Sequence, residues 1–475
     1  MVNQKTFNII YLVGLASYVL MNFWITTVVP ISVGIIMVLQ FITLLSVIFS
    51  GAYIINELTN KYIKTFPPLI FIAFVIILQI VPGVGLKVVD IITVAVFIVG
   101  ARYFKSTQIV KYYSYFCVLL LTITMTLCAC GLVRNLIFSA NSYSRVAFGT
   151  IYPTDFCAHV FFIIIGFIFV KGNNVDIKDV ISLCLFGWFT MCVSKGRNTS
   201  ICFVILALLC LVFYIVNRYQ NRLLRSKVIY GLGVIACIAM PLLAVLMIIM
   251  SYIYDYYALD TLLFKIDVAL STRLSMGRKA FDLYDVKPFG QDVDTNGWGG
   301  FVEENIPFLH PNLINITVAA AVLVFILLVC FLILKKKNIF ITLGGASLLA
   351  VLCYLCRLGF ALKYEPSNEV LTYEQRIADI KEYLEGPYFF LDCSYMDILF
   401  KSGWIMLLFV MAVFCYISYR HLRARQWVRL LVLVVVAVQC TVEHHLLDFA
   451  YNPFWLVLFA PIDNPDSVEI ANSNG

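Results

Sequence analysis

Charge is scarce in this chain of 475 residues. Asp, Glu, Lys and Arg together make up 13% of the sequence, whereas hydrophobic residues make up 62% and the mean hydropathy is +0.93. Soluble domains carry about 25% charged residues, so this composition excludes an ordinary soluble protein. The apolar residues form runs of about 17 to 25, the length that a helix needs to cross a hydrocarbon core about 30 Å thick. The sequence therefore predicts a helical membrane protein.

Several chemical signatures are absent too. The sequence has no Walker loop, dinucleotide fingerprint, internal repeat or low-complexity tract, so nothing in it supports dependence on ATP or NAD, and no cofactor is expected. The 15 cysteines lie almost entirely in apolar runs, where Cys behaves as a small hydrophobe, and they are not a disulfide framework. Cys353 and Cys356 form a CxxC inside one such run, but without a second ligand pair they predict no metal site.

The apolar runs predict a single all-α transmembrane domain over residues 1–475, with about 13–14 helices if a doubtful short segment near Phe454 is included. Residues 7–29 lack a small-residue cleavage site before the next run, so we expect a retained helix and no signal peptide. Two short runs, from Pro67 and Leu86, could be either two spans or a re-entrant pair. The other runs start near Ile31, Tyr112, Pro153, Val180, Thr199, Val228, Leu313, Ile339, Cys393 and Trp427.

Basic residues recur in alternate connections between the runs. Lys and Arg near helix ends are retained on the cytoplasmic side, so we expect a multi-pass protein of the cell membrane with a cytoplasmic N-terminus. The net charge of +7 then needs no nucleic-acid partner, because an anionic inner leaflet attracts the same residues. The basic connections hold Lys61, Lys64, Arg102, Lys105, Lys111, Lys171, Lys178, Arg218, Arg222, Arg225, Lys227, Lys335, Lys336, Lys337, Arg420, Arg423, Arg425 and Arg429.

Two long connections face outward on this topology, residues 254–312 and residues 363–392. Long loops of mixed charge commonly carry function, although solvated caps remain an alternative. Three arginines on this side run against the gradient of positive charge: Arg197 between two spans, and Arg273 and Arg278 in the first long loop. A charge at the membrane edge is costly and tends to mark a site.

The arginines allow two interpretations. On the structural interpretation, Arg197 reaches lipid phosphate or caps a helix end. On the functional interpretation, its guanidinium binds a phosphate or pyrophosphate of a ligand through two hydrogen bonds. Around Arg273 and Arg278, Ser271 or Ser275 could cap a short amphipathic helix on the membrane surface, and arginine near such an N-terminus suits a phosphate oxyanion. That segment is either a ligand site or a plain interfacial helix.

Three motifs on the outward side accompany the Ser-x-Arg of the first long loop. They are RKAFDLYDVKPFGQ at residues 278–291, YFFLDCSYMDILFKSGW at 388–404 and EHHLLDFAYNPF at 443–454. In order and sidedness this set resembles the Wzy-type polysaccharide polymerases, membrane proteins of bacterial capsule and exopolysaccharide clusters in the O-antigen polymerase and ligase superfamily. The match is closest to the versions of Gram-positive bacteria. Two apolar runs, residues 313–334 and 339–362, depart from the family pattern, so no family role is carried onto residues 305–363.

The resemblance implies a metal-independent membrane glycosyltransferase of the GT-C type. It would transfer a growing glycan from undecaprenyl diphosphate to a new lipid-linked repeat unit outside the cytoplasmic membrane, polymerising capsular polysaccharide, exopolysaccharide or O-antigen. Besides these oligosaccharides and membrane lipid, a chain-length regulator and a flippase of the same pathway are possible partners. Outward arginines agree with this, because they would neutralise a diphosphate leaving group. The alternatives are a lipid-linked glycan ligase of the same superfamily and a repeat-unit flippase or transporter.

Such a transfer needs a group that takes the proton of the acceptor hydroxyl. Among the five histidines, His421 falls in a predicted cytoplasmic connection and His159 inside a span. We expect His444 to be the base, because Asp448 lies four residues later and would orient the imidazole from the same helical face. Glu443 is a second possible base. The alternative is that these residues only decorate the outer end of a helix.

Weaker candidates could contact sugars. Asp392 and Tyr395 are three residues apart, so both could face one cavity at the outer start of a span. Asp392 could contact a sugar or an arginine there as a member of the catalytic group with Glu443, His444 and Asp448, or it could instead cap a helix. Asp397 and Lys401 are spaced for a structural ion pair. His310 precedes Pro311 at a predicted helix start, where a structural role is the alternative to a sugar contact.

Overall fold

The computed structural model describes residues 3–60, 88–140, 143–219, 226–256, 258, 261–295, 311–334, 339–361 and 389–462. The candidate His310, the run from Pro67 and nearly all of the second long loop lie outside these residues.

The described chain is mostly helical, as predicted, and folds around long apolar helices. The first half contains α1 (Gln4–Ile25), α2 (Val33–Asn60), α4 (Val88–Gly100), α5 (Ser106–Ala129), the strands β1 (Ile137–Ala140) and β2 (Tyr143–Val146), α6 (Pro153–Lys171), α7 (Ile177–Ser194) and α8 (Arg197–Tyr219). The second half contains α10 (Lys227–Cys237), α11 (Ala239–Tyr252), α12 (Leu262–Ala269), α13 (Arg273–Leu283), α14 (Pro311–Ile333), α15 (Ile339–Ala361), α17 (Ser394–Asp397), α18 (Gly403–Arg423) and α19 (Trp427–Gln439). Short 3-10 turns lie at Ala101–Tyr103, Gly172–Asn174 and Pro453–Val457, and a π-helical turn at Ile398–Ser402 joins α17 to α18.

Nine helices of the described chain are long and apolar enough to cross a membrane, or ten if the bent pair α10 and α11 is one span. Their outward faces carry large apolar side chains, such as Phe41 at 60% exposure and Phe340 at 78%. So much exposed apolar surface suits lipid, not water. These features confirm a multi-pass helical membrane protein. The predicted count of about 13–14 spans exceeds the nine or ten candidates, partly because α19 has only 13 residues.

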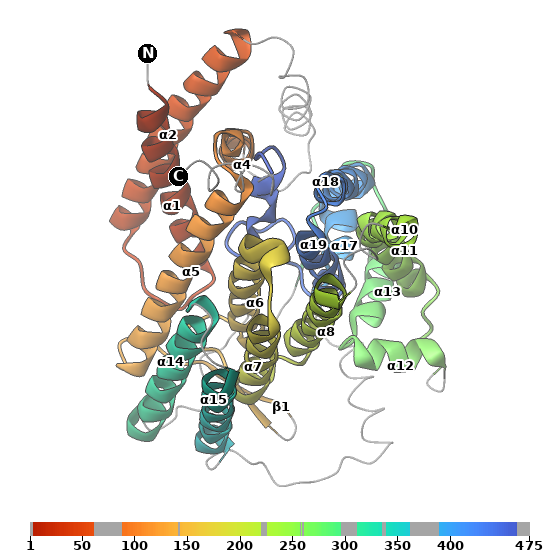
Figure 1. The fold of residues 1–475 in the computed structure, drawn as a ribbon. Coiled ribbons are helices and arrows are strands. Elements are labelled where there is room, and N and C mark those ends of the chain that lie inside the picture. Colours follow the sequence, from red (N-terminus) through yellow and green to blue (C-terminus); the bar gives the residue numbers. More distant parts are fainter. Residues whose placement is uncertain are drawn as a thin grey trace.

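The centre of the bundle is α6, whose apolar window is 89% buried inside the protein. Figure 1 shows α1, α2, α4 and α5 on one side of it, α10, α11, α13, α17 and α18 on the other, and α14 and α15 packed beside α5 and α7. Polar side chains on α6 therefore face protein and not lipid. The hairpin of β1 and β2, which the apolar pattern did not predict, pairs Ile137 with Val146 and contacts α7 and α15.

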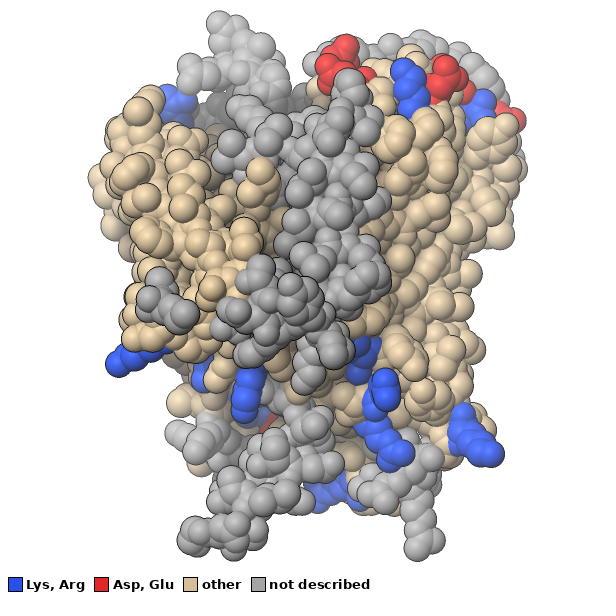
Figure 2. Space-filling view, turned by 90° about the horizontal axis from the view of Figure 1, so that it is seen from above, with Lys and Arg blue, Asp and Glu red and all other residues tan. Residues whose placement is uncertain are grey.

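Charged groups lie at the two ends of this bundle. In Figure 2 a belt of uncharged residues separates a rim whose visible charged groups are almost all Lys and Arg from an opposite rim where acidic and basic groups mix. We call the end that holds Lys171, Arg420 and Arg429 the basic face, and the end where α6, α8 and α13 begin the site face. At the basic face Lys171 pairs with Asp179 and donates to the carbonyl of Leu332, 3.0 Å away, at the end of α14.

Residues 440–462, the described chain after α19, form no α-helix. Residues 440–461 return from the site face to the basic face through the protein interior, where the amide of Ser106 donates to the carbonyl of Pro461 over 2.9 Å and Arg420 donates to the carbonyl of Ala460 over 2.8 Å. Irregular backbone is tolerated at membrane depth only when protein surrounds it. The doubtful segment near Phe454 is thus a buried 3-10 turn and not a spanning helix.

Candidate functional site

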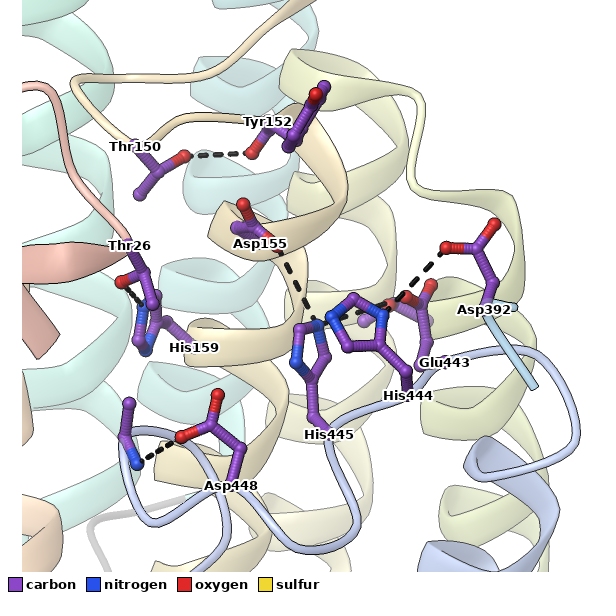
Figure 3. A network of polar contacts seen from close by, with 12 residues as sticks. Thr26, Thr150, Tyr152, Asp155, His159, Asp392, Glu443, His444, His445 and Asp448 are labelled. Carbon is purple, nitrogen blue, oxygen red and sulfur yellow. Dashed lines mark hydrogen bonds and ion pairs between the residues drawn. The ribbon is translucent and has the colours of Figure 1, made fainter. Parts of the chain in front are cut away.

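Asp392 lies at the centre of a charged cluster at the site face. One carboxylate oxygen, Oδ2, lies 2.8 Å from Nη2 of Arg273, and the other, Oδ1, lies 3.8 Å from Nδ1 of His444 (Figure 3). No side chain caps α17 at Cys393. The arginine contact predicted for Asp392 is therefore confirmed, and its alternative role as a helix cap is wrong.

The backbone around Arg273 holds its side chain in place. Ser271 and Thr272 adopt left-handed conformations, with φ of 56° and 67°, and end the short α12 so that α13 starts at Arg273. The guanidinium then donates from Nε to the carbonyl of Val442 at 3.0 Å and from Nη1 to that of Ser271 at 2.7 Å. With Asp392 on Nη2, the whole guanidinium group is oriented.

The cap of α13 differs from the prediction. Asp267, and not Ser271 or Ser275, accepts hydrogen bonds from the free amides of α13, at 2.7 Å from Leu274 and 3.1 Å from Ser275. The hydroxyl of Ser275 donates instead to the carbonyl of Thr272. A single acidic residue in the apolar sequence of α12 was the available signal for this cap.

The other two predicted arginines lie near this cluster but have different partners. Arg197 begins α8 and donates through Nη2 to the carbonyl of Val268 at 3.2 Å and to the hydroxyl of Ser271 at 3.3 Å. It thus holds the end of α12, as the capping interpretation predicted, and remains exposed. Arg278 pairs with Asp282 on its own helix at 2.8 Å, and none of its contacts within the described chain reaches Asp392.

Two further cations stand at this end of the bundle. Arg145, on β2, donates to the carbonyl of Ser194 at 3.3 Å, and its charge acts on Asp392. Lys195 follows Ser194 in a left-handed conformation, with φ of 53°, at the turn between α7 and α8. The sequence analysis did not select Arg145 because only the fold brings β2 beside this turn.

The partner of His444 is not the one that the sequence predicted. Residues 443–448 form turns and not a helix, so Asp448 is not on one helical face with His444. Asp448 is half-buried and accepts a hydrogen bond from the amide of Ala450 at 2.8 Å, whereas Asp392 is the carboxylate beside His444. The helical spacing argument failed because the apolar pattern gave no sign that the helix ends at Gln439.

Electrostatics favour a cationic His444. Burial alone would lower the pKa of His444, but the Asp392 carboxylate outweighs it and raises that pKa to about 9. Burial would likewise raise the pKa of Asp392, but Arg273 and His444 hold it below its usual range. At neutral pH this cluster therefore carries two positive charges and one negative charge. A base that already holds its proton is poorly matched to proton removal near pH 7.

Glu443 is buried beside this cluster. Nε2 of His445 lies 4.0 Å from Oε2 of Glu443 and 3.7 Å from Oδ1 of Asp155, in the first turn of α6 (Figure 3). Burial raises the pKa of Glu443 to about 7 and lowers the pKa of His445 well below its usual value. Glu443 thus suits proton uptake near neutral pH better than His444. The sequence analysis did not select Asp155, although an acidic residue in the first turn of a long apolar run could have identified it.

Aromatic stacking extends this polar region along α6. The ring of Tyr451 stacks on His445, with centroids 3.8 Å apart, and on His159, with centroids 4.0 Å apart. Nε2 of His159 lies 2.9 Å from the hydroxyl of Thr26 at the end of α1 (Figure 3). The sequence placed His159 inside a span, which is confirmed, but its link to His445 depends on the return of residues 440–461 through the bundle.

Tyr395 does not face this site. Its side chain is fully buried, and its hydroxyl donates to the carbonyl of Ala437 at 2.6 Å in the packing between α17 and α19. The expected sugar contact is therefore replaced by a structural one. Asp397 and Lys401 form the predicted ion pair at 2.6 Å.

No metal site emerges from the described residues, among which no group of three or more His, Cys, Asp or Glu side chains is arranged to hold an ion. Cys353 and Cys356 are buried free thiols.

Comparison with known proteins does not add a family assignment. No protein-family model matches the chain, and no curated protein or solved structure matches it. Function must therefore be argued from the motifs and from the geometry of the site.

Proposed function

We propose that the protein is a membrane polymerase of undecaprenyl-diphosphate-linked oligosaccharide repeat units, a metal-independent glycosyltransferase with a GT-C type arrangement of about 13–14 helices. The supporting observation is Asp392 bridged between Arg273 and His444 at one end of an apolar helix bundle. On this proposal the site face is extracytoplasmic and the basic face cytoplasmic, because the cytoplasmic side of membrane proteins is rich in Lys and Arg.

The cluster suits an anionic group. Three helices, α6, α8 and α13, start at the site face, and helix N-termini carry partial positive charge. The net positive charge of Arg273, His444 and Asp392 adds to this field. Because these groups are already oriented, they would stabilise negative charge developing on a diphosphate without further rearrangement.

The transfer reaction needs few protein groups. The acceptor hydroxyl oxygen forms a bond to the anomeric carbon of the growing glycan, while the bond from that carbon to the diphosphate oxygen breaks. The departing diphosphate keeps the electron pair beside Arg273 and His444. The hydroxyl proton goes to a base, for which Glu443 and His444 are the candidates, with the pKa values favouring Glu443.

One rival function gains support from the interior of the site. Asp155 and His159 are buried on α6, and titratable residues inside membrane helices commonly mark transport or proton pathways. A repeat-unit flippase would use such a pathway. A lipid-linked glycan ligase would use the same cations as a polymerase with a different acceptor.

A strain that lacks the protein distinguishes these functions. Polymerase function predicts loss of polymer, with single repeat units accumulating on the lipid carrier at the outer face of the membrane. Units trapped at the inner face would reject the polymerase in favour of the flippase. Normal polymer that fails to reach its final acceptor would instead identify the ligase.

A further inference from the structure

We propose that Asp155, His445 and Glu443 form a buried proton-accepting group, which we call the acid trio, in which Glu443 takes the hydroxyl proton and the other two residues position it. This inference deepens the proposed function and rests on it for the identity of the reaction. The trio itself stands on geometry that no part of the sequence pattern predicted.

The acid trio joins two parts of the chain that are far apart in the sequence, in the buried interior of the bundle. Asp155 comes from the first turn of α6, and Glu443 and His445 come from the loop after α19. All three are buried, at 8%, 5% and 2% exposure respectively. Nε2 of His445 lies 3.7 Å from Asp155 and 4.0 Å from Glu443, separations that a small side-chain rotation or a bridging water would close.

His445 is a polar group whose hydrogen-bonding capacity is unused. Neither ring nitrogen has a hydrogen-bond partner among the residues that the structure describes. Leaving such a donor and acceptor buried destabilises the folded protein, and an apolar ring would stack on Tyr451 without that cost. A purely packing role therefore does not account for histidine at this position.

The charges around His445 favour proton sharing. The rings of His444 and His445 are centred only 4.2 Å apart, so a proton on one disfavours a proton on the other. His444 holds its proton beside Asp392, which leaves His445 neutral between two carboxyl groups. Two carboxylates on one buried imidazole repel each other, so the trio takes up one proton readily.

The trio gives the transfer step a complete proton balance. As the glycosidic carbon–oxygen bond forms and the bond to diphosphate breaks, the acceptor hydroxyl gives its proton to the carboxylate of Glu443. The product is a neutral carboxylic acid beside His445 and Asp155. His444 stays cationic next to the departing diphosphate. The site thus holds a protonated group, His444, and a proton acceptor, Glu443, at separate positions.

Other charged and titratable groups also face the trio. Arg273 on α13 lowers the pKa of Glu443, as does His444, whereas Asp392 and Asp155 raise it. The remaining neighbours are Tyr152 just before α6, Cys157 and His159 on α6, Cys202 on α8, Cys440, Asp448 and Tyr451.

Infrared titration of the purified full-length protein in lipid nanodiscs tests the trio without substrate. The carbonyl stretch of protonated carboxylic acids is followed against pH in the wild type and in four variants. Glu443→Gln should remove the contribution of Glu443, which titrates near pH 7, and so lower the amplitude of the band. Asp155→Asn removes a repelling charge and should lower its midpoint by about one pH unit. His445→Phe keeps the ring stack but removes the polar neighbour, and should raise the midpoint.

His421→Gln is the matched control, because His421 is equally buried but lies at the basic face. It should leave the midpoint unchanged. Shifts of opposite sign in Asp155→Asn and His445→Phe support the trio, since a merely structural role would not produce them. A band that keeps its full wild-type amplitude in Glu443→Gln, or one whose midpoint stays fixed in Asp155→Asn, would overturn it.

The pH profile of polymer formation in membranes then separates this inference from the proposed function. If the polymerase function and the acid trio are both correct, Asp155→Asn shifts the acidic limb of the pH profile to lower pH, and Asp155→Glu keeps this limb at its wild-type position. If the infrared midpoints shift as expected but no variant changes polymer formation, the polymerase proposal fails. If Arg273→Ala abolishes polymer while the Asp155 variants keep the wild-type pH profile, the trio fails.

Discussion

Both ends of the helix bundle hold Lys and Arg that donate to backbone carbonyls, but the helix ends at which these cations lie differ. At the basic face they meet backbone carbonyls and helix C-termini: Lys171 donates to Leu332 and Arg429 donates to Phe169 near the end of α6. There, cations and the negative ends of helices compensate each other. At the site face Arg197 and Arg273 are the first residues of α8 and α13, where the helix ends are themselves positive.

This difference distinguishes cations that stabilise the fold from cations that prepare a site. Arg273 is compensated in part by Asp392, which His444 also shares, so positive potential remains. We therefore expect substitutions at the basic face to change stability, and substitutions at the site face to change activity.

The largest effect is expected for Arg273. Arg273→Ala removes the oriented guanidinium from the proposed diphosphate site and should reduce polymer formation by about 10²–10³-fold, measured in membranes with lipid-linked repeat units. Arg273→Lys keeps the charge but lacks the planar guanidinium that donates two hydrogen bonds side by side. Its rate of polymer formation should lie between those of Arg273→Ala and the wild type. Full activity in Arg273→Ala would show that the two faces do not differ in the way proposed.

Lys171 provides the corresponding test at the basic face. Lys171→Ala leaves Asp179, whose side chain is 1% exposed, without its ion-pair partner. Breaking a buried pair in this way costs about 3–5 kcal/mol, so the thermal unfolding midpoint in nanodiscs should fall clearly. Protein that remains folded should polymerise at the wild-type rate. A large loss of turnover per folded molecule would contradict the comparison.

The pH dependence of stability reports on His444. Its pKa is about 9 in the folded protein, against about 6.5 for an unperturbed histidine. The stabilisation that it provides is therefore complete below about pH 6.5 and lost as pH rises through about 9. Thermal unfolding across this window should show the decline, and His444→Gln should flatten it. An equally steep decline in that variant would assign the effect to other groups.

The smallest effect is expected for Tyr395, which the sequence predicted to contact sugar. Tyr395→Phe removes the hydrogen bond to the carbonyl of Ala437 and should cost about 1–3 kcal/mol of stability, because a buried carbonyl loses its partner. Polymer formation should be unchanged. A rise in the substrate concentration needed for half-maximal rate would restore the original interpretation of Tyr395.

The sequence predicted what depends on local pattern. Long apolar runs located α5, α6, α7 and α8, because hydrocarbon thickness alone sets their length. The same criterion failed for residues 440–461, since an apolar segment buried in protein looks like one buried in lipid. There, side chains replace helical hydrogen bonds: Asn452 and Trp455 both donate to the carbonyl of Leu446.

The sequence predicted which residues belong to the candidate site better than it predicted which of them contact each other. Asp392, Arg273 and His444 were all selected, but spacing assigned Asp448 to His444, and only the fold supplied Asp392. Asp155 lies far from Glu443 in the sequence, so no periodicity could connect them. Contacts between distant segments are decided by packing, which one sequence does not display.

The irregular segment at residues 440–461 also determines when the protein becomes complete during synthesis. Its backbone is stabilised by earlier parts of the chain, including the hydroxyl of Tyr113, which donates to the carbonyl of Phe449, and the amide of Ser106. Such a segment cannot enter the bilayer by itself. It must dock into a bundle that has already assembled, so Glu443, His444 and His445 reach the site only after the helices from α1 to α19 have been synthesised. A partly synthesised or truncated protein would therefore reside in the membrane without an assembled site.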